Sequence, residues 1–402
     1  MQHILFLFVM LTLSGCAYQS NSDMPIDVSD RARVLAADLA PSSLRDELLQ
    51  CGVSAFAPTE FSISHRGAPL GYPEHTREGY LAAATMGAGV IECDVTFTRD
   101  HELVCRHSQC DLHSTTNILQ TPLADQCSEP FRPATAEQPA SAKCCTSDLT
   151  LDQFRTLCGR RDVVNRQATT VDEYLNPPLD PRIEPWRNRQ VSCGTLLTHA
   201  ESITLINASG RAFTPELKSP MVPMPHDGLT QAGYADKMIN EYRKAGIEPS
   251  RVYPQSFNIN DVNYWISQHP EFGQQAVYLD PRGRNPDFQP TLEGMQALKR
   301  SGVNIIAPPM PMLLRLAADG SLEPSNYAQF AKQAGLEIIT WTFESGDPTS
   351  PQNWLYTGLH DFMQNEASML QVLDVLAQQV GIRGIFSDWP GTVTYYAACR
   401  ND

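Results

Sequence analysis

The chain has 402 residues, of which 42% are apolar and 19% charged, so it can bury a sizeable core and is not a disordered polypeptide. Its 45 acidic residues outnumber 30 basic ones and give a formal net charge of −15. This balance argues against nucleic acid as a partner, because binding a phosphate backbone needs clustered Lys and Arg. Eleven cysteines exceed what a cytosolic chain usually keeps reduced and indicate an oxidising compartment.

The N-terminus has the pattern expected of an export signal. An apolar run from Ile4 to Leu13 is too short to span a bilayer but has the length of a signal-peptide core. The sequence Leu13-Ser14-Gly15-Cys16 resembles a bacterial lipobox, which predicts a signal peptide over 1–15, lipidation of Cys16, and a membrane-anchored lipoprotein in the periplasm or at the cell surface. The first five residues lack Lys and Arg, so a plain cleavable signal and a secreted soluble protein are the alternative.

Ten cysteines remain after Cys16, and an even number in an exported chain predicts disulfides, although the sequence does not choose among the pairings. No two of them are separated by two residues, as a zinc site of paired cysteines requires. The ten are Cys51, Cys93, Cys105, Cys110, Cys127, Cys144, Cys145, Cys158, Cys193 and Cys399.

Short apolar strands alternate with amphipathic helices over most of the chain. Residues 16–58 are polar, with one helical patch at 30–49, and are interpreted as a tether. Eight strands with intervening helices then predict one α/β domain over 59–402, a (β/α)₈ TIM-type barrel rather than an open doubly wound sheet. The expected strands are 61–65, 90–97, 212–217, 252–257, 275–279, 303–307, 337–343 and 384–387, and the expected helices are 77–86, 229–244, 261–268, 292–300, 325–333 and 365–379.

One interval, 111–197, breaks this alternation. It is rich in Pro, Thr, Asp and Cys, and only 151–157 has a convincing helical pattern. A loop of this length in a compact domain is usually functional or separately stabilised. Because it follows the second strand, we expect a cysteine-rich insertion above the mouth of the barrel.

Acidic residues end two of the expected strands. Alternate residues of a strand share a face, so Glu92 and Asp94 point the same way, about 6.6 Å apart along the strand. Oxygen ligands at this spacing suit Mg²⁺ or Ca²⁺ rather than zinc, and Glu216 on another strand end can complete a three-carboxylate site. Lys218, on the same face as Glu216, offers a point charge for a phosphate oxygen.

Two histidines accompany these acids. His65-Arg66-Gly67 ends the first expected strand, and His107 follows Asp94 by thirteen residues. Two histidines beside an arginine and paired acids predict general acid and base catalysis around a phosphate. Arg66 can contact phosphate oxygens in a bidentate way.

These motifs together resemble the glycerophosphodiester phosphodiesterase family. The matching segments run in the family's order over about 330 residues, from Ser64 to Pro390. They are His65-Arg66-Gly67, Pro73-Glu74-His75-Thr76, Gly87-Ala88, Ile91-Glu92-Cys93-Asp94-Val95, Thr98-Arg99-Asp100, Leu103-Val104, His107, Glu216-Leu217-Lys218, Gln255-Ser256-Phe257, Trp341-Thr342 and Gly384-Ile385-Phe386-Ser387-Asp388-Trp389-Pro390.

The resemblance implies a barrel enzyme that hydrolyses glycerophosphodiesters, small-molecule substrates, to glycerol 3-phosphate and an alcohol. It implies one divalent cation, Ca²⁺ or Mg²⁺, and we favour Ca²⁺ because exported oxygen-ligand sites meet plentiful calcium. The first nucleophile is either water or the substrate's own 2-hydroxyl. The implied roles are general base and acid for His65 and His107, cation binding for Glu92, Asp94 and Glu216, and phosphate binding for Arg66 and Lys218.

Three positions depart from the family's pattern. His75 stands where the family usually has Asn, Ser108 where it has Asp, and Ser114 near a usual Arg. We expect His75 to shape a turn or, alternatively, to add a third titrating group, and Asp111 to replace the acid missing after His107.

The cysteines on either side of His107 leave two pairings open. Either Cys105 and Cys110 form a small disulfide that fixes this loop, or Cys110 reaches the insertion.

Two other functions compete with this one. A phospholipase D-like barrel would cleave lysophospholipid or sphingolipid headgroups, helped by the insertion and the membrane anchor. A non-catalytic surface-binding lipoprotein would have lost ligands, yet both histidines and all three carboxylates are present. The aromatic residues Phe257, Trp341 and Trp389 are expected either to line the substrate pocket or to pack at strand ends.

Overall fold

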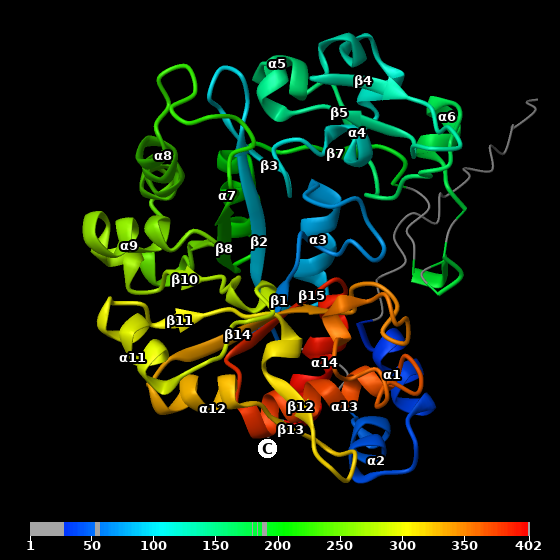
Figure 1. The fold of residues 1–402 in the computed structure, drawn as a ribbon, viewed down its shortest axis with the longest axis vertical. Helices are drawn as coiled ribbons and strands as arrows, with labels where there is room; N and C mark the ends of the chain where they lie inside the picture. Colours follow the sequence, from blue (N-terminus) through cyan, green and yellow to red (C-terminus); the bar gives the residue numbers. More distant parts are fainter. Residues whose placement is uncertain (1–27, 53–56, 179, 183, 187–190, 401–402) are drawn as a thin grey trace, which may run out of the picture.

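The structure, a computed structural model, describes residues 28–52, 57–178, 180–182, 184–186 and 191–400. Eight parallel strands close into a barrel, with each strand hydrogen-bonded to the next and β15 returning to β1 (Figure 1). In order around the barrel, the strands are β1 (Thr59–Ser64), β2 (Ala88–Phe97), β8 (Ala212–Leu217), β9 (Gln255–Ser256), β10 (Val277–Tyr278), β11 (Ile305–Ile306), β14 (Glu337–Phe343) and β15 (Gly384–Ser387). The predicted TIM-type barrel is therefore confirmed.

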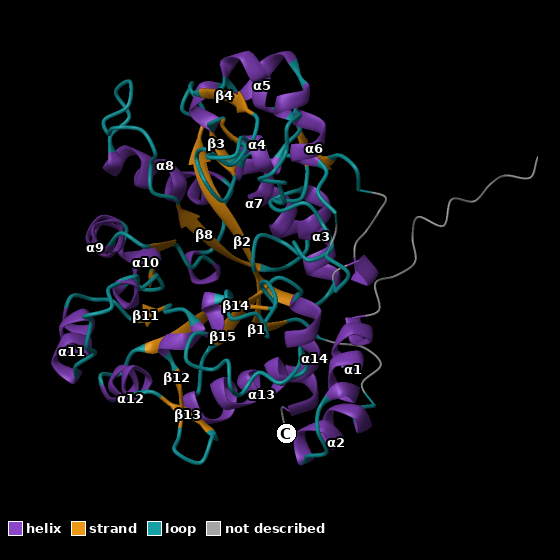
Figure 2. Ribbon diagram, turned by 45° about the vertical axis from the view of Figure 1, so that its right-hand side comes forward, coloured by secondary structure: helices purple, strands orange, loops and turns teal. Residues whose placement is uncertain are grey.

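Helices surround the barrel, as Figure 2 shows. Several begin at a Thr or Ser whose hydroxyl accepts the N–H three residues on, as Thr76 and Thr198 do. The helices that pack around the strands are α3 (Arg77–Thr85), α7 (His199–Ala208), α8 (Gln231–Lys244), α9 (Ile259–Gln268), α10 (Pro270–Gly273), α11 (Leu292–Arg300), α12 (Asn326–Gln333), α13 (Ser368–Val375) and α14 (Pro390–Arg400). None of the helices in the described ranges has the length and apolarity that crossing a membrane requires.

Strand periodicity separates two apolar layers. On β2, Val90 points into the barrel, where it packs with Ile63, Ile305 and other inward residues. The alternate residues, among them Ile91, point outward and pack against the helices. The same alternation carries the following polar residues of β2 to the inner face at the strand's carboxyl end.

The insertion forms a separate lobe beyond the end of β2 (Figure 1). A short strand, β3 (Leu103–Cys105), pairs antiparallel with β2 and leads into it. The lobe has its own apolar core, which includes Leu112, Phe154 and Tyr174. Its elements are α4 (Leu112–Thr115), β4 (Glu129–Arg132), β5 (Ser141–Lys143), α5 (Leu151–Phe154), β6 (Cys158–Gly159), α6 (Val171–Leu175) and β7 (Gly194–Thr195), and a further hairpin, β12 (Leu314–Leu316) and β13 (Leu322–Pro324), lies outside it.

The prediction that residues 16–58 form a tether is wrong for residues 28–52, which the structure describes. Two helices, α1 (Val28–Asp38) and α2 (Ser43–Gln50), pack against the barrel. Leu35 and Leu48 of these helices belong to the main apolar core, so burial holds this segment in place. The expected signal peptide at 1–15 and the lipidated Cys16 lie outside the described residues.

All ten cysteines that follow Cys16 form disulfides. The Cys105–Cys110 bridge considered from the sequence is wrong, because strand pairing brings Cys105 to Cys93, while Cys110 reaches the insertion. The five bridges are Cys51–Cys399, Cys93–Cys105, Cys110–Cys145, Cys127–Cys144 and Cys158–Cys193.

Candidate active site

Two neighbouring strands place three carboxylates together. In the parallel ladder between β2 and β8, Asp94 lies opposite Glu216, and Glu92 precedes Asp94 on the same inward face. One oxygen from each carboxylate lies within 4.8 Å of the others, and all three residues are buried. The geometry therefore joins the three acids that the sequence analysis selected.

The electrostatics of this cluster fit a bound cation. Burial and the neighbouring carboxylates raise the pKa of Glu92 well above its ordinary value, and burial raises that of Glu216 to about 7. Asp94 Oδ1 is buried without a hydrogen-bond partner among the described residues. An oxygen-only donor set that is crowded by its own negative charge suits a hard divalent cation such as Mg²⁺ or Ca²⁺.

Two basic side chains border the carboxylates. Lys218 Nζ lies 2.7 Å from Glu216 Oε1. Arg66 Nη1 donates to Glu74 Oε2 at 3.0 Å, and its backbone N–H donates to Glu92 Oε2 at 2.8 Å. Although burial acts against them, the surrounding acids raise the pKa of both basic groups, so both side chains stay cationic.

His65 directly follows β1 and is oriented by an acid from the opposite end of the chain. Its Nδ1 lies 2.5 Å from Asp388 Oδ1, in the segment that follows β15. The pairing of β1 with β15 brings these residues together. A carboxylate at Nδ1 fixes the tautomer in which Nε2 accepts a proton.

His107 comes from the end of the β3 segment and is half-buried beside the cluster. Burial lowers the pKa of its ring well below the ordinary value, and the neighbouring Arg66 and Lys218 lower it further. The Cys93–Cys105 bridge joins the strand that carries the carboxylates to the segment that carries this histidine. His107 is thereby held close to the carboxylates.

His75, the residue that departs from the family's Asn, is fully buried. Its Nε2 lies 2.8 Å from Asp94 Oδ2, and its Nδ1 lies 2.9 Å from the hydroxyl of Tyr80. Its φ of +50° places it in a left-handed turn. This turn and the contact with Asp94 make His75 a positioning residue for that carboxylate, and burial lowers the pKa of its ring.

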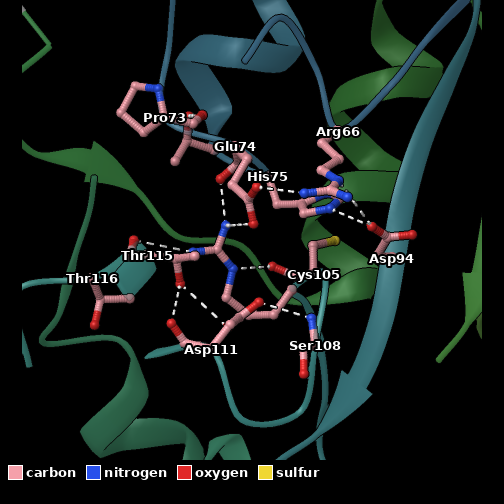
Figure 3. A network of polar contacts seen from close by, with 12 residues as sticks. Arg66, Pro73, Glu74, His75, Asp94, Cys105, Ser108, Asp111, Thr115 and Thr116 are labelled. Carbon is pink, nitrogen blue, oxygen red and sulfur yellow. Dashed lines mark hydrogen bonds and ion pairs between the residues drawn. The ribbon is translucent and has the colours of Figure 1, made fainter. Parts of the chain in front are cut away.

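A polar network adjoins the site, and Figure 3 shows it around Glu74, Asp94 and Asp111. Arg106, which is fully buried, donates to the carbonyls of Glu74 and Thr115, while Glu74 also pairs with Arg66. Asp111 Oδ2 accepts from the backbone N–H of Ser108 at 2.8 Å. Asp111 therefore fixes the backbone after His107, and among the described residues it forms no hydrogen bond with the ring of that histidine.

A cavity of about 490 Å³ opens over these groups at the carboxyl ends of the strands. Phe257 and Trp341 line it, as does Trp354, which the sequence analysis did not select. Trp389 does not. It is 4% exposed and packs against Trp186, which corresponds to the second of its two expected roles, packing at a strand end.

The cavity thus contains both histidines, the three carboxylates, Arg66 and Lys218, all of which were selected from the sequence. Sequence reasoning did not assign roles to Glu74, Asp388 or Gln255, although each lies in a motif that was noted. Gln255 Nε2 donates to Glu92 Oε1 at 2.9 Å, so it positions that carboxylate. The closed barrel shows their partners in the cavity: Glu74 contacts Arg66, Asp388 contacts His65, and Gln255 contacts Glu92.

Comparisons with known proteins identify the family of the chain. The model of the glycerophosphoryl diester phosphodiesterase family matches residues 65–392. An extracellular protein of Arthroderma benhamiae is 39% identical over 246 residues, which are 60% of this chain and 99% of that one.

Solved structures share the fold. A crystal structure from Silicibacter pomeroyi superposes with a TM-score of 0.55 at 20% identity and covers 85% of this chain and 93% of that one. A phosphodiesterase of Oleispira antarctica, solved in complex with the product sn-glycerol-3-phosphate, superposes with a TM-score of 0.50 at 14% identity and covers 85% and 96% of the two chains.

Proposed function

Because the chain belongs to the glycerophosphoryl diester phosphodiesterase family, we propose that it hydrolyses glycerophosphodiesters to glycerol 3-phosphate and an alcohol. The observation that carries this proposal is the convergence of two histidines, three carboxylates and two basic side chains on one cavity. In the net reaction, one P–O bond to the alcohol breaks and one P–O bond to the oxygen of water forms.

Glu92, Asp94 and Glu216 would hold one divalent cation, Ca²⁺ or Mg²⁺. When bound, it supplies a positive charge that stabilises the non-bridging phosphate oxygens in the transition state. His75 and Gln255 hold the carboxylates in place through their contacts with Asp94 and Glu92.

The chain's own residues bind and orient the phosphate. Arg66 and Lys218 border the carboxylates and remain cationic, so each can donate to a phosphate oxygen. Holding the diester at two points beside the histidines aligns the scissile bond for attack.

His65 is the proposed general base. With Nδ1 held by Asp388, Nε2 is the nitrogen that takes the proton from the attacking hydroxyl, and the carboxylate stabilises the imidazolium that forms. His107 is the proposed general acid and delivers a proton to the departing alcohol oxygen. Arg66 and Lys218 lower the pKa of its ring, so this role requires the negative charge of the bound phosphate to offset both cations. The attacking hydroxyl belongs to water or, in a two-step route, to the substrate's own 2-hydroxyl.

The test is release of glycerol 3-phosphate from a panel of purified glycerophosphodiesters with Ca²⁺ or Mg²⁺ present. We expect activity that a chelator abolishes and added cation restores, and a loss on the order of 10²–10⁴ in rate for His65→Ala and His107→Ala. As a readout besides activity, Ca²⁺ or Mg²⁺ should raise the melting temperature of the native chain but not of Glu92→Gln. No product from any member of the panel would overturn the proposal.

A second candidate activity, phospholipase D-like cleavage of lysophospholipids, is favoured by the rim of the cavity. Met221 and Trp354 both line it and are 52% and 51% exposed, which offers an apolar surface to an acyl chain. Parallel incubations with glycerophosphocholine and lysophosphatidylcholine separate the two activities. Cleavage of the lipid alone would make this second candidate the function.

We also propose that the chain is exported. Five disulfides suit an oxidising compartment, and the similar protein of Arthroderma benhamiae is named an extracellular protein. The anchor proposed at Cys16 is tested by Cys16→Ser, which should move the protein from the membrane fraction to the soluble fraction. An unchanged distribution would favour a plain cleavable signal.

A further inference from the structure

The cavity has two chemically different halves. The carboxylates, both histidines and the two phosphate-binding cations come from β1, β2, β3, β8 and the residues that directly follow these strands. The opposite wall comes from the ends of β9, β10 and β14 and their loops, and its main side chains are Phe257, Trp341 and Trp354. A diester whose phosphate lies at the first half must direct one of its alcohol arms toward this second wall.

The second wall is a continuous aromatic surface. Phe257 and Trp341 meet edge to face with ring centroids 5.7 Å apart, and Trp341 meets Trp354 in the same way at 5.7 Å. The indole N–H of Trp341 donates to the carbonyl of Ala307 at 2.8 Å, so it is not available to substrate. Taken alone, such a wall would suit a quaternary ammonium group, which binds over aromatic faces.

A positively charged side chain of the protein, that of Arg284, already lies on this wall. Arg284, at the end of the short helix η6 (Arg282–Arg284) after β10, lines the cavity with its guanidinium 4.9 Å from the centre of the Phe257 ring. Among the described residues, no carboxylate forms an ion pair with it, in contrast to Arg282, which is paired with Asp280. Arg284 therefore brings an unneutralised positive charge to the aromatic half.

We propose that Arg284 makes the aromatic wall a second anion subsite, so that the enzyme selects diesters whose alcohol arm carries a carboxylate or a phosphate. Stacking on Phe257 limits the side chain's freedom and leaves its N–H groups for the substrate. A cationic headgroup such as choline would have to bind over the same aromatic surface, where the positive charge of Arg284 would repel it. This inference rests on the proposed hydrolysis of glycerophosphodiesters.

The test compares two substrates that differ by one carboxylate, glycerophosphoserine and glycerophosphoethanolamine. The quantity measured is the ratio of their kcat/KM values, serine ester over ethanolamine ester. A charge-assisted hydrogen bond is strong enough to change this ratio on the order of tenfold. We expect Arg284→Gln to lower the ratio by about that factor, Arg284→Glu to lower it further, and Arg284→Lys to keep most of it.

The matched control is Arg300→Gln, an exposed arginine at the end of α11 that does not line the cavity, which should leave the ratio unchanged. If Arg284→Gln hydrolyses both esters with the ratio of the native enzyme, the subsite is overturned and the proposed function stands. If the native enzyme releases glycerol 3-phosphate from neither ester nor from any other glycerophosphodiester, the proposed function itself fails.

Discussion

At the scale of single residues, the site depends on groups outside the cluster of three carboxylates that hold its members and the two histidines in place. Asp388 holds His65, His75 holds Asp94, and Asp111 holds the backbone that follows His107. Each of these contacts fixes one orientation of a group that would otherwise rotate. Preorganisation of this kind lowers the barrier because the cost of ordering is met during folding and not during reaction.

The first prediction concerns Asp388. Asp388→Asn should lower kcat on the order of 10²-fold or more with little change in KM, because the amide no longer stabilises the imidazolium of His65. Steady-state kinetics on a glycerophosphodiester measure this split. Asp361→Asn, an exposed acid on the loop before α13, is the control. Native kcat in Asp388→Asn would mean that His65 needs no orienting carboxylate.

The second prediction is a pH effect at Asp111, which burial gives a pKa of about 7 in the folded chain against an ordinary value of 3.8. Well below pH 3.8, Asp111 is protonated in both the folded and the unfolded chain. As the pH rises toward 7, the unfolded chain releases this proton while the folded chain keeps it, so stability is lost across this window and stays lost above it.

Relative to Asp111→Asn, the native chain should therefore lose at most about 4 kcal/mol of unfolding free energy between pH 4 and pH 8. Urea unfolding of both proteins at several pH values measures the difference. A constant difference over this range would show that the Asp111 proton is not linked to folding.

At the scale of elements, helix α1 is part of the barrel's framework. Arg31 donates from Nε to Glu344 Oε1 at 2.7 Å, and both side chains are almost fully buried. Glu344 also accepts from Ser387 and Thr392, each at 2.8 Å, in the segment that carries Asp388. Helix α1 thus neutralises a buried acid that contacts the segment carrying Asp388.

The third prediction follows from this burial. Arg31→Ala should cost about 3–5 kcal/mol of unfolding free energy because it leaves the buried Glu344 without its cationic partner. Arg155→Ala is a matched control, since Arg155 also pairs with a glutamate, Glu201, at 2.7 Å, but both partners are exposed. That variant should cost about 1 kcal/mol or less. Equal losses in urea unfolding would contradict the role given to burial.

At the scale of the whole molecule, disulfides hold together parts that lie far apart in the sequence. Cys51 after α2 bonds Cys399 in α14 and links positions 348 residues apart. The insertion has its own bridge, Cys158–Cys193, which spans 35 residues. In the chain-entropy model a disulfide stabilises by restricting the unfolded chain, and the effect grows with the logarithm of the loop length.

The fourth prediction compares these two bridges. Replacing Cys51 and Cys399 with alanine should cost about 2 kcal/mol more than replacing Cys158 and Cys193, because the first loop is roughly tenfold longer. Denaturant unfolding of the two double variants gives the comparison. A larger loss from the insertion's bridge would show that native-state packing, and not loop length, sets the contribution of each bridge.

The sequence alone predicted a closed barrel. Apolar alternation is a local pattern, and few folds other than a barrel accommodate eight strands with intervening helices. The sequence also identified Glu92, Asp94 and Glu216, because strand periodicity and the resemblance to a known family pointed to the same positions. The register of β2 against β8 then brought these three residues together. Local patterns of this kind need no knowledge of distant partners.

Tertiary structure decided what depends on contacts between distant segments. The pairing of Cys105 with Cys93, the packing of α1 and α2 against the barrel, and the burial of Trp389 all depend on tertiary contacts that no local pattern encodes. The same holds for Asp388 beside His65 and for Arg284 over Phe257. Which residues become partners depends on how the barrel closes and on which apolar surfaces of its helices are left for other segments to bury. Both are properties of the whole chain.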